Sequence, residues 1–192
     1  KDVVRSVKPI NNLGNIYVTH LNDAKKATAY YKRGLEISRI HGLKNMQLVF
    51  SLNIGEISKS NFEYEMALES LLEANKIAVE LQDPKEIAIC QSVIGSIYLE
   101  TEKYDKAYEC YVYVSSVMTD DESRSLELSI ASYDFLGSFY FCMGEWDKAL
   151  YYYHGSKELF AQNDLRQYYK FKFKILLAEI FKNKRFDKAE VD

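Results

Sequence analysis

The chain of 192 residues carries 25 basic and 28 acidic residues, for a net charge of −3, and 47% of its residues are hydrophobic. Charges of both signs are mixed along it, so we expect no basic stripe for nucleic-acid phosphates and no nucleic-acid partner. Its apolar runs are far shorter than the roughly 20 residues that span a bilayer, so we expect no membrane insertion. Two prolines and eight glycines fit a folded, mostly helical chain.

The chain predicts a succession of helices separated by short turns. Residues 1–12 lead into the first helix, and Pro9 either begins that helix or kinks one that began earlier. His41-Gly42 supplies a glycine stop, and Asp83-Pro84-Lys85-Glu86 is typical of a capped helix start. Thr119–Ser123 and Asn163-Asp164 are the corresponding breaks further on. Phe171–Ile175 alternates as a strand would, but its register with the rest of the chain predicts a helix.

One pattern recurs five times, ending in alanines separated by 40, 40, 42 and 40 residues. A fixed period of this size predicts stacked supersecondary units. We expect the units at residues 8–42, 43–82, 83–120, 121–163 and 164–192. The last unit turns before Phe186 and its second helix is missing, so we expect the chain to be part of a longer protein in which the array continues, or the array to end in a partner helix. The five copies of the pattern are Leu13–Ala27, Asn53–Ala67, Ile94–Ala107, Leu136–Ala149 and Leu176–Ala189.

Small residues occupy fixed places in each unit, where they would let two helix axes cross closely; helices with larger side chains stand about 8–10 Å apart. In the middle of the first helix they are Gly14, Gly55, Gly95, Gly137 and Ala178, and early in the second Ala27, Ala67, Ala107, Ala149 and Ala189. Seven residues after these alanines, Gly34, Ala74, Val114 and Ser156 should meet the next unit.

This arrangement, with a tyrosine three residues after the small one and an aromatic before the next alanine, resembles the tetratricopeptide repeat. The resemblance runs from about Pro9 to the end, and it implies an all-α fold, a right-handed α-α superhelix of antiparallel helix pairs. The first unit has one extra turn residue, the fifth has one fewer, and Ser58 replaces the usual aromatic in the second. Units of about 40 residues resemble those of bacterial regulatory proteins and those of kinesin light chains, and the Lys-, Ile-, Asn- and Tyr-rich usage is typical of low-GC bacteria.

Catalytic and metal-binding patterns are not evident. His20, His41 and His154 form no HExxH motif or Cys/His cluster, which argues against a zinc site and a Cys-His nucleophile. No phosphate-binding glycine loop is present, so we predict neither a cofactor nor an enzyme. Three widely spaced cysteines fit reduced, buried thiols in the cytoplasm; they are Cys90, Cys110 and Cys142.

The resemblance implies that first helices line a concave face, where a ligand would meet polar side chains next to the small residues. These candidates are Asn11, Asn15, Glu56, Ser96, Asp134, Ser138 and Glu179. The lining leans acidic, which suits a peptide with amine or guanidinium groups; the alternative is an ordinary solvated helix face.

The sequence bears on two further interaction modes. The family's carboxylate-gripping pattern needs a lysine where Asn11 stands and basic residues where Ile89 and Val93 stand, so it is not supported. Tyr30, Tyr151 and Tyr152 lie off the apolar stripe and either anchor a partner on the outer face or pack partly against the next unit.

The sequence therefore predicts a protein- or peptide-binding module, which could also self-associate. We expect it to be an input or docking region of a larger bacterial signalling protein, such as a diguanylate cyclase or histidine kinase. The alternatives are a peptide-pheromone receptor domain and a passive assembly scaffold attached to an enzyme.

Overall fold

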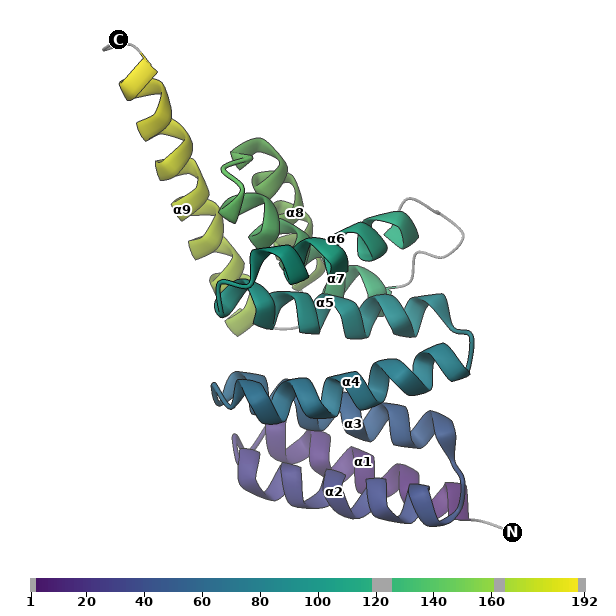
Figure 1. Ribbon diagram of the computed structural model, residues 1–192. Helices are drawn as coiled ribbons and strands as arrows, with labels where there is room; N and C mark the ends of the chain where they lie inside the picture. Colours follow the sequence, from purple (N-terminus) through teal and green to yellow (C-terminus); the bar gives the residue numbers. More distant parts are fainter. Residues whose placement is uncertain (1–2, 119–125, 161–164, 190–192) are drawn as a thin grey trace. The chain divides into compact units, whose positions relative to one another are not determined.

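The computed structural model describes the backbone of residues 3–118, 126–160 and 165–189, and the side chains of residues 7–117, 128, 129, 132–158 and 170–183. Every secondary-structure element in these ranges is an α-helix, which confirms the predicted all-α fold (Figure 1). The helices are α1 (Val3–Thr19), α2 (Ala24–Ile40), α3 (Lys44–Ser60), α4 (Tyr64–Glu80), α5 (Pro84–Glu100), α6 (Tyr104–Met118), α7 (Leu126–Cys142), α8 (Trp146–Phe160) and α9 (Leu165–Ala189).

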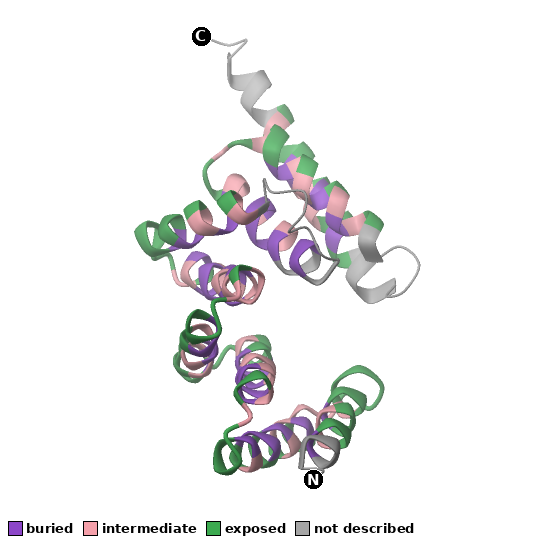
Figure 2. Cartoon of the chain, turned by 90° about the vertical axis from the view of Figure 1, so that its right-hand side faces the viewer, coloured by how far each residue is buried: buried purple, intermediate pink, exposed green. Residues whose placement is uncertain are grey.

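The chain divides into two compact units, residues 1–90 and 91–192, and the division falls inside α5 after Cys90. In the first unit, α1 packs on α2, α2 on α3 and α3 on α4. Buried residues lie on the facing sides of these helices (Figure 2). One core of the unit is formed by Val7, Ala27, Tyr31, Leu35, Phe50, Ile54 and Ile57, from α1, α2 and α3.

In the second unit, α6 contacts α7, α7 packs on α8 and α8 on α9. Stacked and edge-to-face aromatic rings fill much of the space between α6, α7 and α8. Tyr111 stacks on Phe139 with ring centroids 4.4 Å apart, and Tyr140 stacks on Tyr152 at 5.7 Å. Between α8 and α9 the buried core contains Ala149, Tyr153, Phe171, Ile175 and Ala178.

The small residues lie where another side chain leaves no room for a Cβ atom. A Cβ built on Gly14 would come within 2.2 Å of the Tyr31 ring, and one on Gly95 within 2.5 Å of the Phe135 ring. Gly55 and Gly137 meet Leu71 and Tyr153 in the same way. The second-helix alanines in the described part, Ala27, Ala67, Ala107 and Ala149, are fully buried. Close helix crossings therefore depend on these positions.

Helix ends follow the expected capping chemistry. Pro84 is the first residue of α5, and Asp83 Oδ1 accepts hydrogen bonds from the backbone N–H groups of Lys85 and Glu86 at 3.1 and 3.2 Å. Gly42 adopts a φ of +65° after α2, as a left-handed cap requires. Non-glycine residues take the same conformation in other turns, namely Asn22, Phe62, Gln82 and Glu102.

At the ends of the chain the structure decides one open alternative and shows one expectation to be wrong. Pro9 lies inside α1, so the first helix begins earlier, at Val3. The turn expected before Phe186 is absent, because α9 continues without a break to Ala189. The stretch Lys182–Arg185 contains neither glycine nor proline, and Asn183, which could adopt a left-handed cap, does not by itself end the helix.

The structure also bears on the expected helix at Phe171–Ile175 and on the exposure of three tyrosines. Phe171–Ile175 is helical, as register predicted. Tyr151 is exposed, whereas Tyr30 and Tyr152 are half-buried. The breaks expected at Thr119–Ser123 and Asn163-Asp164, and the side chain of Ala189, lie outside the described residues.

Candidate functional site

In the first unit, asparagine side chains connect the first helices of successive repeats. Asn53 of α3 donates a 2.9 Å hydrogen bond from Nδ2 to Oδ1 of Asn11 on α1. Both residues are half-buried. The bond leaves the Asn11 amide NH₂ and the Asn53 carbonyl as groups that can still pair with a ligand.

Asn15, one turn further along α1, is held by a buried tyrosine. The hydroxyl of Tyr31 donates to Asn15 Oδ1 at 2.6 Å. Burial and, to a lesser degree, the charge of Glu56 raise the pKa of Tyr31 to about 12, so the hydroxyl stays a donor at neutral pH. Asn15 itself is exposed, and its NH₂ group is the part that a ligand could reach. We name Asn11, Asn15, Asn53 and Glu56 the asparagine row.

Glu56 gives the asparagine row a carboxyl group. Desolvation by the surrounding protein raises its pKa, and Lys59 partly offsets this effect. The side chain nevertheless remains in contact with solvent, so it can meet a ligand. Among the described residues no ion pair with Glu56 is formed within 4 Å, and a cation from a ligand would stabilise its charged form.

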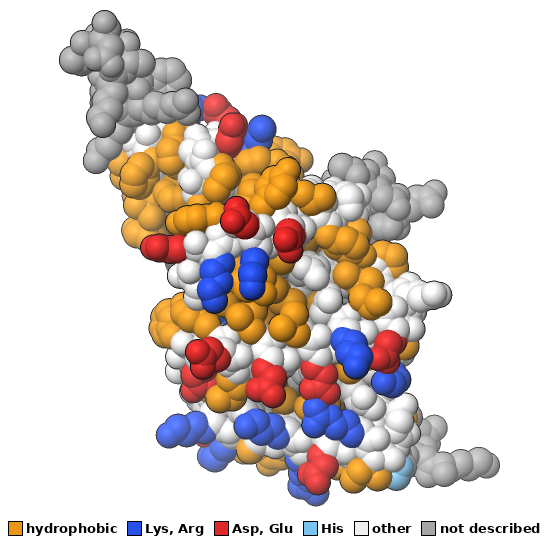
Figure 3. Space-filling model, viewed as in Figure 1, with side chains coloured by type: hydrophobic (Ala, Val, Ile, Leu, Met, Phe, Trp, Pro, Cys, Tyr) orange, Lys and Arg blue, Asp and Glu red, His pale blue; other side chains and the backbone are white. Residues whose placement is uncertain are grey.

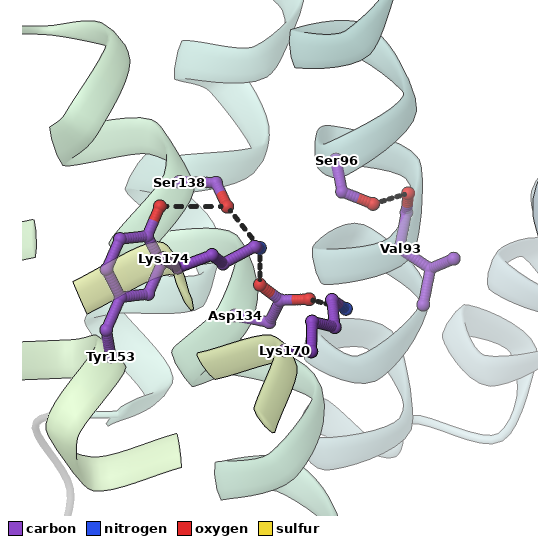
Figure 4. Close-up of polar contacts among 7 residues, drawn as sticks. All are labelled: Val93, Ser96, Asp134, Ser138, Tyr153, Lys170 and Lys174. Carbon is purple, nitrogen blue, oxygen red and sulfur yellow. Dashed lines mark hydrogen bonds and ion pairs between the residues drawn. The ribbon is translucent and has the colours of Figure 1, made fainter. Parts of the chain in front are cut away.

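In the second unit, two lysines of α9 converge on one carboxylate of α7 (Figure 4). Lys170 Nζ lies 2.8 Å from Asp134 Oδ2, and Lys174 forms an ion pair with Asp134 Oδ1. Burial opposes ionisation of Asp134, but the two lysines outweigh it and hold the pKa of the carboxyl well below its usual range. One carboxylate neutralises only one of two ammonium groups, so this group of three carries a net positive charge.

Two hydroxyls extend the group. Lys174 Nζ donates to Ser138 Oγ at 3.1 Å, and the Tyr153 hydroxyl donates to the same oxygen at 3.4 Å (Figure 4). Tyr153 is buried, and this burial raises the pKa of its hydroxyl above the ordinary value. The ring of Tyr153 also lies 5.3 Å from Lys174 Nζ, a cation–π distance. We name Asp134, Ser138, Tyr153, Lys170 and Lys174 the lysine cluster.

Two of the sequence-predicted residues lie elsewhere. The hydroxyl of Ser96 donates to the backbone carbonyl of Val93 within its own helix at 2.7 Å, apart from the lysine cluster (Figure 4). Glu179 is exposed, and helical spacing puts it on the side of α9 opposite Lys170. The structure thus brings Asn11, Asn15 and Glu56 to one site and Asp134 and Ser138 to another.

Lys170, Lys174, Asn53 and Tyr31 were not among the predicted site residues. The charge of α9 was the signal for the lysines, because this helix carries eight Lys or Arg residues and two acidic ones. The sequence as a whole mixes its charges, but this segment does not. Asn53 and Tyr31 gave no comparable signal, since Tyr31 belongs to the packing pattern of the repeat.

Charged residues also form a band on the face of the first unit seen in Figure 3, where acidic side chains lie beside basic ones. Arg39 of α2 is 2.6 Å from Glu73 of α4, and Lys44 is 2.9 Å from Glu80. Exposed pairs of this kind contribute about 0–1 kcal/mol each. They leave no excess charge there, and this face offers less than the asparagine row for recognition.

The cysteines and histidines form no chemical site. Cys90 and Cys110 are buried, and burial raises the pKa of each thiol to about 12, which leaves both unreactive at neutral pH. Cys142 is exposed. Within the ranges whose side chains are described, no group of three or more His, Cys, Asp or Glu residues is placed to hold a metal ion.

Comparison with known proteins identifies the repeat. The family model of the tetratricopeptide repeat matches residues 7–41, which include most of α1 and all of α2, and residues 91–112 of α5 and α6. The two matched segments are tetratricopeptide repeats. Such repeats generally mediate interactions between proteins.

Solved structures share the fold of this chain. The crystal structure of BtubC (BKLC) from P. vanneervenii matches with a TM-score of 0.65 over 96% of this chain and 76% of that one. The two sequences are 17% identical, so the likeness concerns the fold alone. A search of curated proteins gave no match.

None of the described helices is both long enough and apolar enough to cross a bilayer.

Proposed function

We propose that this chain is a binding module for a protein or peptide, and that its first helices make the contact. The asparagine row supports this proposal most directly. An asparagine amide offers both a donor and an acceptor, as the peptide group does, so it can pair with the main chain of an extended ligand whatever the ligand's sequence. Asn11, Asn15 and Asn53 are positioned for such pairing by hydrogen bonds of 2.6 and 2.9 Å.

The charged side chains of the asparagine row and those of the lysine cluster favour different ligand groups. Glu56 in the asparagine row would select a lysine or arginine side chain. Lys170 and Lys174 share one carboxylate in the lysine cluster, which would select an acidic side chain or a carboxylate. The charge of Asp134 alone would favour a ligand amine at this position. Such an amine would have to displace Lys170 and Lys174 from the carboxylate.

A selection from a phage-displayed library of random linear peptides tests the proposal. The immobilised 192-residue chain should enrich a family of peptides, whose synthetic copies are then measured by isothermal titration calorimetry. We expect Asn53→Ala to weaken binding by about five- to tenfold, the cost of a hydrogen bond or two. Glu56→Lys should weaken basic peptides most.

Glu69→Lys on α4 is the matched control, because Glu69 is an exposed carboxylate on a second helix. It should leave peptide affinity unchanged. If no peptide family were enriched, or if Glu69→Lys weakened binding as much as Glu56→Lys, binding through the first helices would be rejected.

We further propose that the module is cytoplasmic and is a regulatory input or docking region of a larger bacterial signalling protein. The 40- to 42-residue spacing of the repeats supports this context, as does the presence of free thiols, including the exposed Cys142. Ligand binding would favour one curvature of the repeats and so shift the state of an attached domain. The coding sequence on both sides of this segment tests the idea, and a neighbouring catalytic or DNA-binding domain would support it.

A further inference from the structure

Helix α9 carries apolar side chains on two opposite faces. Phe171, Ile175 and Ala178 are buried against α8. Phe173, Leu176 and Ile180 point the other way and are 61%, 52% and 40% exposed. Their spacing of three and four residues places them in one line on the helix. We name these three residues the open stripe; hydrophobic side chains are visible where α9 lies in Figure 3.

Helices in equivalent positions are covered on both sides. α3 packs between α2 and α4, and α7 contacts both α6 and α8. Within the described residues α9 packs on α8 and also meets α7 through Lys170, Lys174 and Phe181, whereas the exposed residues of the open stripe lie on neither of these sides. An apolar line opposite the core is what a helix needs when a second layer covers it. The open stripe is therefore a surface that fits another helix.

The charges beside the open stripe indicate which helix fits. Three of the four described lysines of α9 are already paired, Lys170 and Lys174 with Asp134 and Lys182 with Asp147. The open side keeps Lys172 and Glu179, both exposed. Among the described side chains of α9, residues 170–183, these two charges cancel on the open side, so this part of the surface carries no net charge that would favour an anionic membrane or a strongly acidic partner.

Lys172 and Glu179 also give the surface self-complementarity. They are seven residues apart, two helical turns, and lie along the same edge of the open stripe. If a second α9 packs antiparallel, each Lys172 approaches the Glu179 of the other copy, and the contact occurs twice. A two-fold symmetric interface requires this reciprocity. Parallel two-fold packing would instead place this edge of the two helices on opposite sides of the stripe, where neither Lys172 nor Glu179 meets its counterpart.

We propose that the open stripe is a dimerisation surface, on which α9 of a second copy of this chain packs antiparallel. Phe173, Leu176 and Ile180 interlock across the two-fold axis, and the two Lys172–Glu179 pairs fix the direction. The antiparallel order also keeps apart the basic C-terminal ends of the two helices. The dimer does not depend on the peptide-binding role proposed above.

Sedimentation velocity of the 192-residue chain tests this directly. The wild type should form a dimer as its concentration rises toward the order of 100 µM, a range typical of weak interfaces. Leu176→Glu and Ile180→Glu should each give a monomer with unchanged helical circular dichroism. Leu72→Glu is the control, because Leu72 on α4 is equally exposed at 50% but lies outside the stripe; it should leave the dimer intact.

Charge reversal tests the direction of packing. Lys172→Glu and Glu179→Lys should each weaken dimerisation by about tenfold, because two attractive pairs become repulsive. The double variant restores both pairs and should recover the wild-type affinity. A wild type that stays monomeric, or that binds phosphatidylserine vesicles through this face, overturns the proposal. So does a double variant no better than the single ones.

Discussion

The hydroxyl of Tyr31 donates a 2.6 Å hydrogen bond to the side-chain carbonyl of Asn15. Tyr31 is a packing residue, 2% exposed, whose ring fills the space next to Gly14. Asn15 is an exposed member of the asparagine row. One tyrosine thus fixes a helix crossing and orients a candidate binding group, which couples the scaffold to the site.

Tyr31→Phe should separate the two roles. The ring still packs, but the hydrogen bond is lost, so we expect the free energy of unfolding to fall by about 0.5–1.5 kcal/mol. The Asn15 side chain should lose its fixed orientation, seen as a shift and broadening of its amide NMR signals. Tyr30→Phe is the control, because the Tyr30 ring stacks on Tyr17. Equal effects of the two substitutions in urea denaturation would argue against the bond.

Gly95→Leu should destabilise the second unit by about 1–3 kcal/mol, because the new side chain overpacks a helix crossing. A Cβ on Gly95 already comes within 2.5 Å of the Phe135 ring and 2.9 Å of Cys110 Cβ. Thermal denaturation measures the cost. An unchanged melting temperature would contradict the crossing described above.

The smaller change Gly95→Ala allows a sharper control. In a Phe135→Leu background the flat ring is gone, and Gly95→Ala should cost less than it does in the wild type. A double-mutant cycle gives this coupling. If the cost were the same in both backgrounds, Phe135 would not be the group that excludes a side chain at position 95.

The periodic part of the structure could be read from the sequence because it depends on residue size. A small residue, such as Gly14, Gly95 or Ala107, recurs at each position where two helices approach closely. The all-α fold predicted from this pattern is the one observed. The break before Phe186 could not be read in this way. A helix ends where a cap or a breaker stops it, and similarity to other units does not supply either one.

The candidate site was less accessible to sequence reasoning. Asn11, Asn15 and Glu56 were placed next to one another by the repeat period alone. Lys170 was missed because its partner Asp134 lies 36 residues earlier, and a repeat period says nothing about which long side chains cross between units. The sequence therefore predicted a negative charge around Asp134, whereas the two lysines make the net charge of the cluster positive.

Phe62→Gly should stabilise the first unit. Phe62 has a φ of +63° and is 76% exposed, so it bears the steric cost of the left-handed conformation with little burial in return. Glycine removes that cost, and we expect a gain of about 0.5–1 kcal/mol. Asn61→Gly, one residue earlier at a φ of −90°, should instead lower stability. Urea denaturation of both variants decides, and a loss of stability in Phe62→Gly would contradict the assigned strain.

The lysine cluster should make the free energy of unfolding depend on pH in the acidic range. The pKa of Asp134 is lowered in the folded chain because Lys174 and Lys170 outweigh the burial of the carboxyl. For a carboxyl with a lowered folded pKa, the stabilisation is complete above the unfolded pKa of 3.8. It is then lost as the pH falls through the folded value, because the unfolded chain takes up the proton first.

Asp134→Asn should therefore lower the free energy of unfolding by about 1.5–3 kcal/mol at pH 7, the range for hydrogen bonds to charged groups. The difference from wild type should stay constant down to about pH 5 and shrink below pH 4. Asp147→Asn is the matched control: Asp147 also pairs with a lysine, Lys182, but its side chain is 82% exposed against 27% for Asp134. Exposed pairs contribute little, so this variant should differ from wild type by less than about 1 kcal/mol at every pH. If urea denaturation at pH 3, 5 and 7 gave the two variants the same profile, the two lysines would not be what stabilises the Asp134 carboxylate.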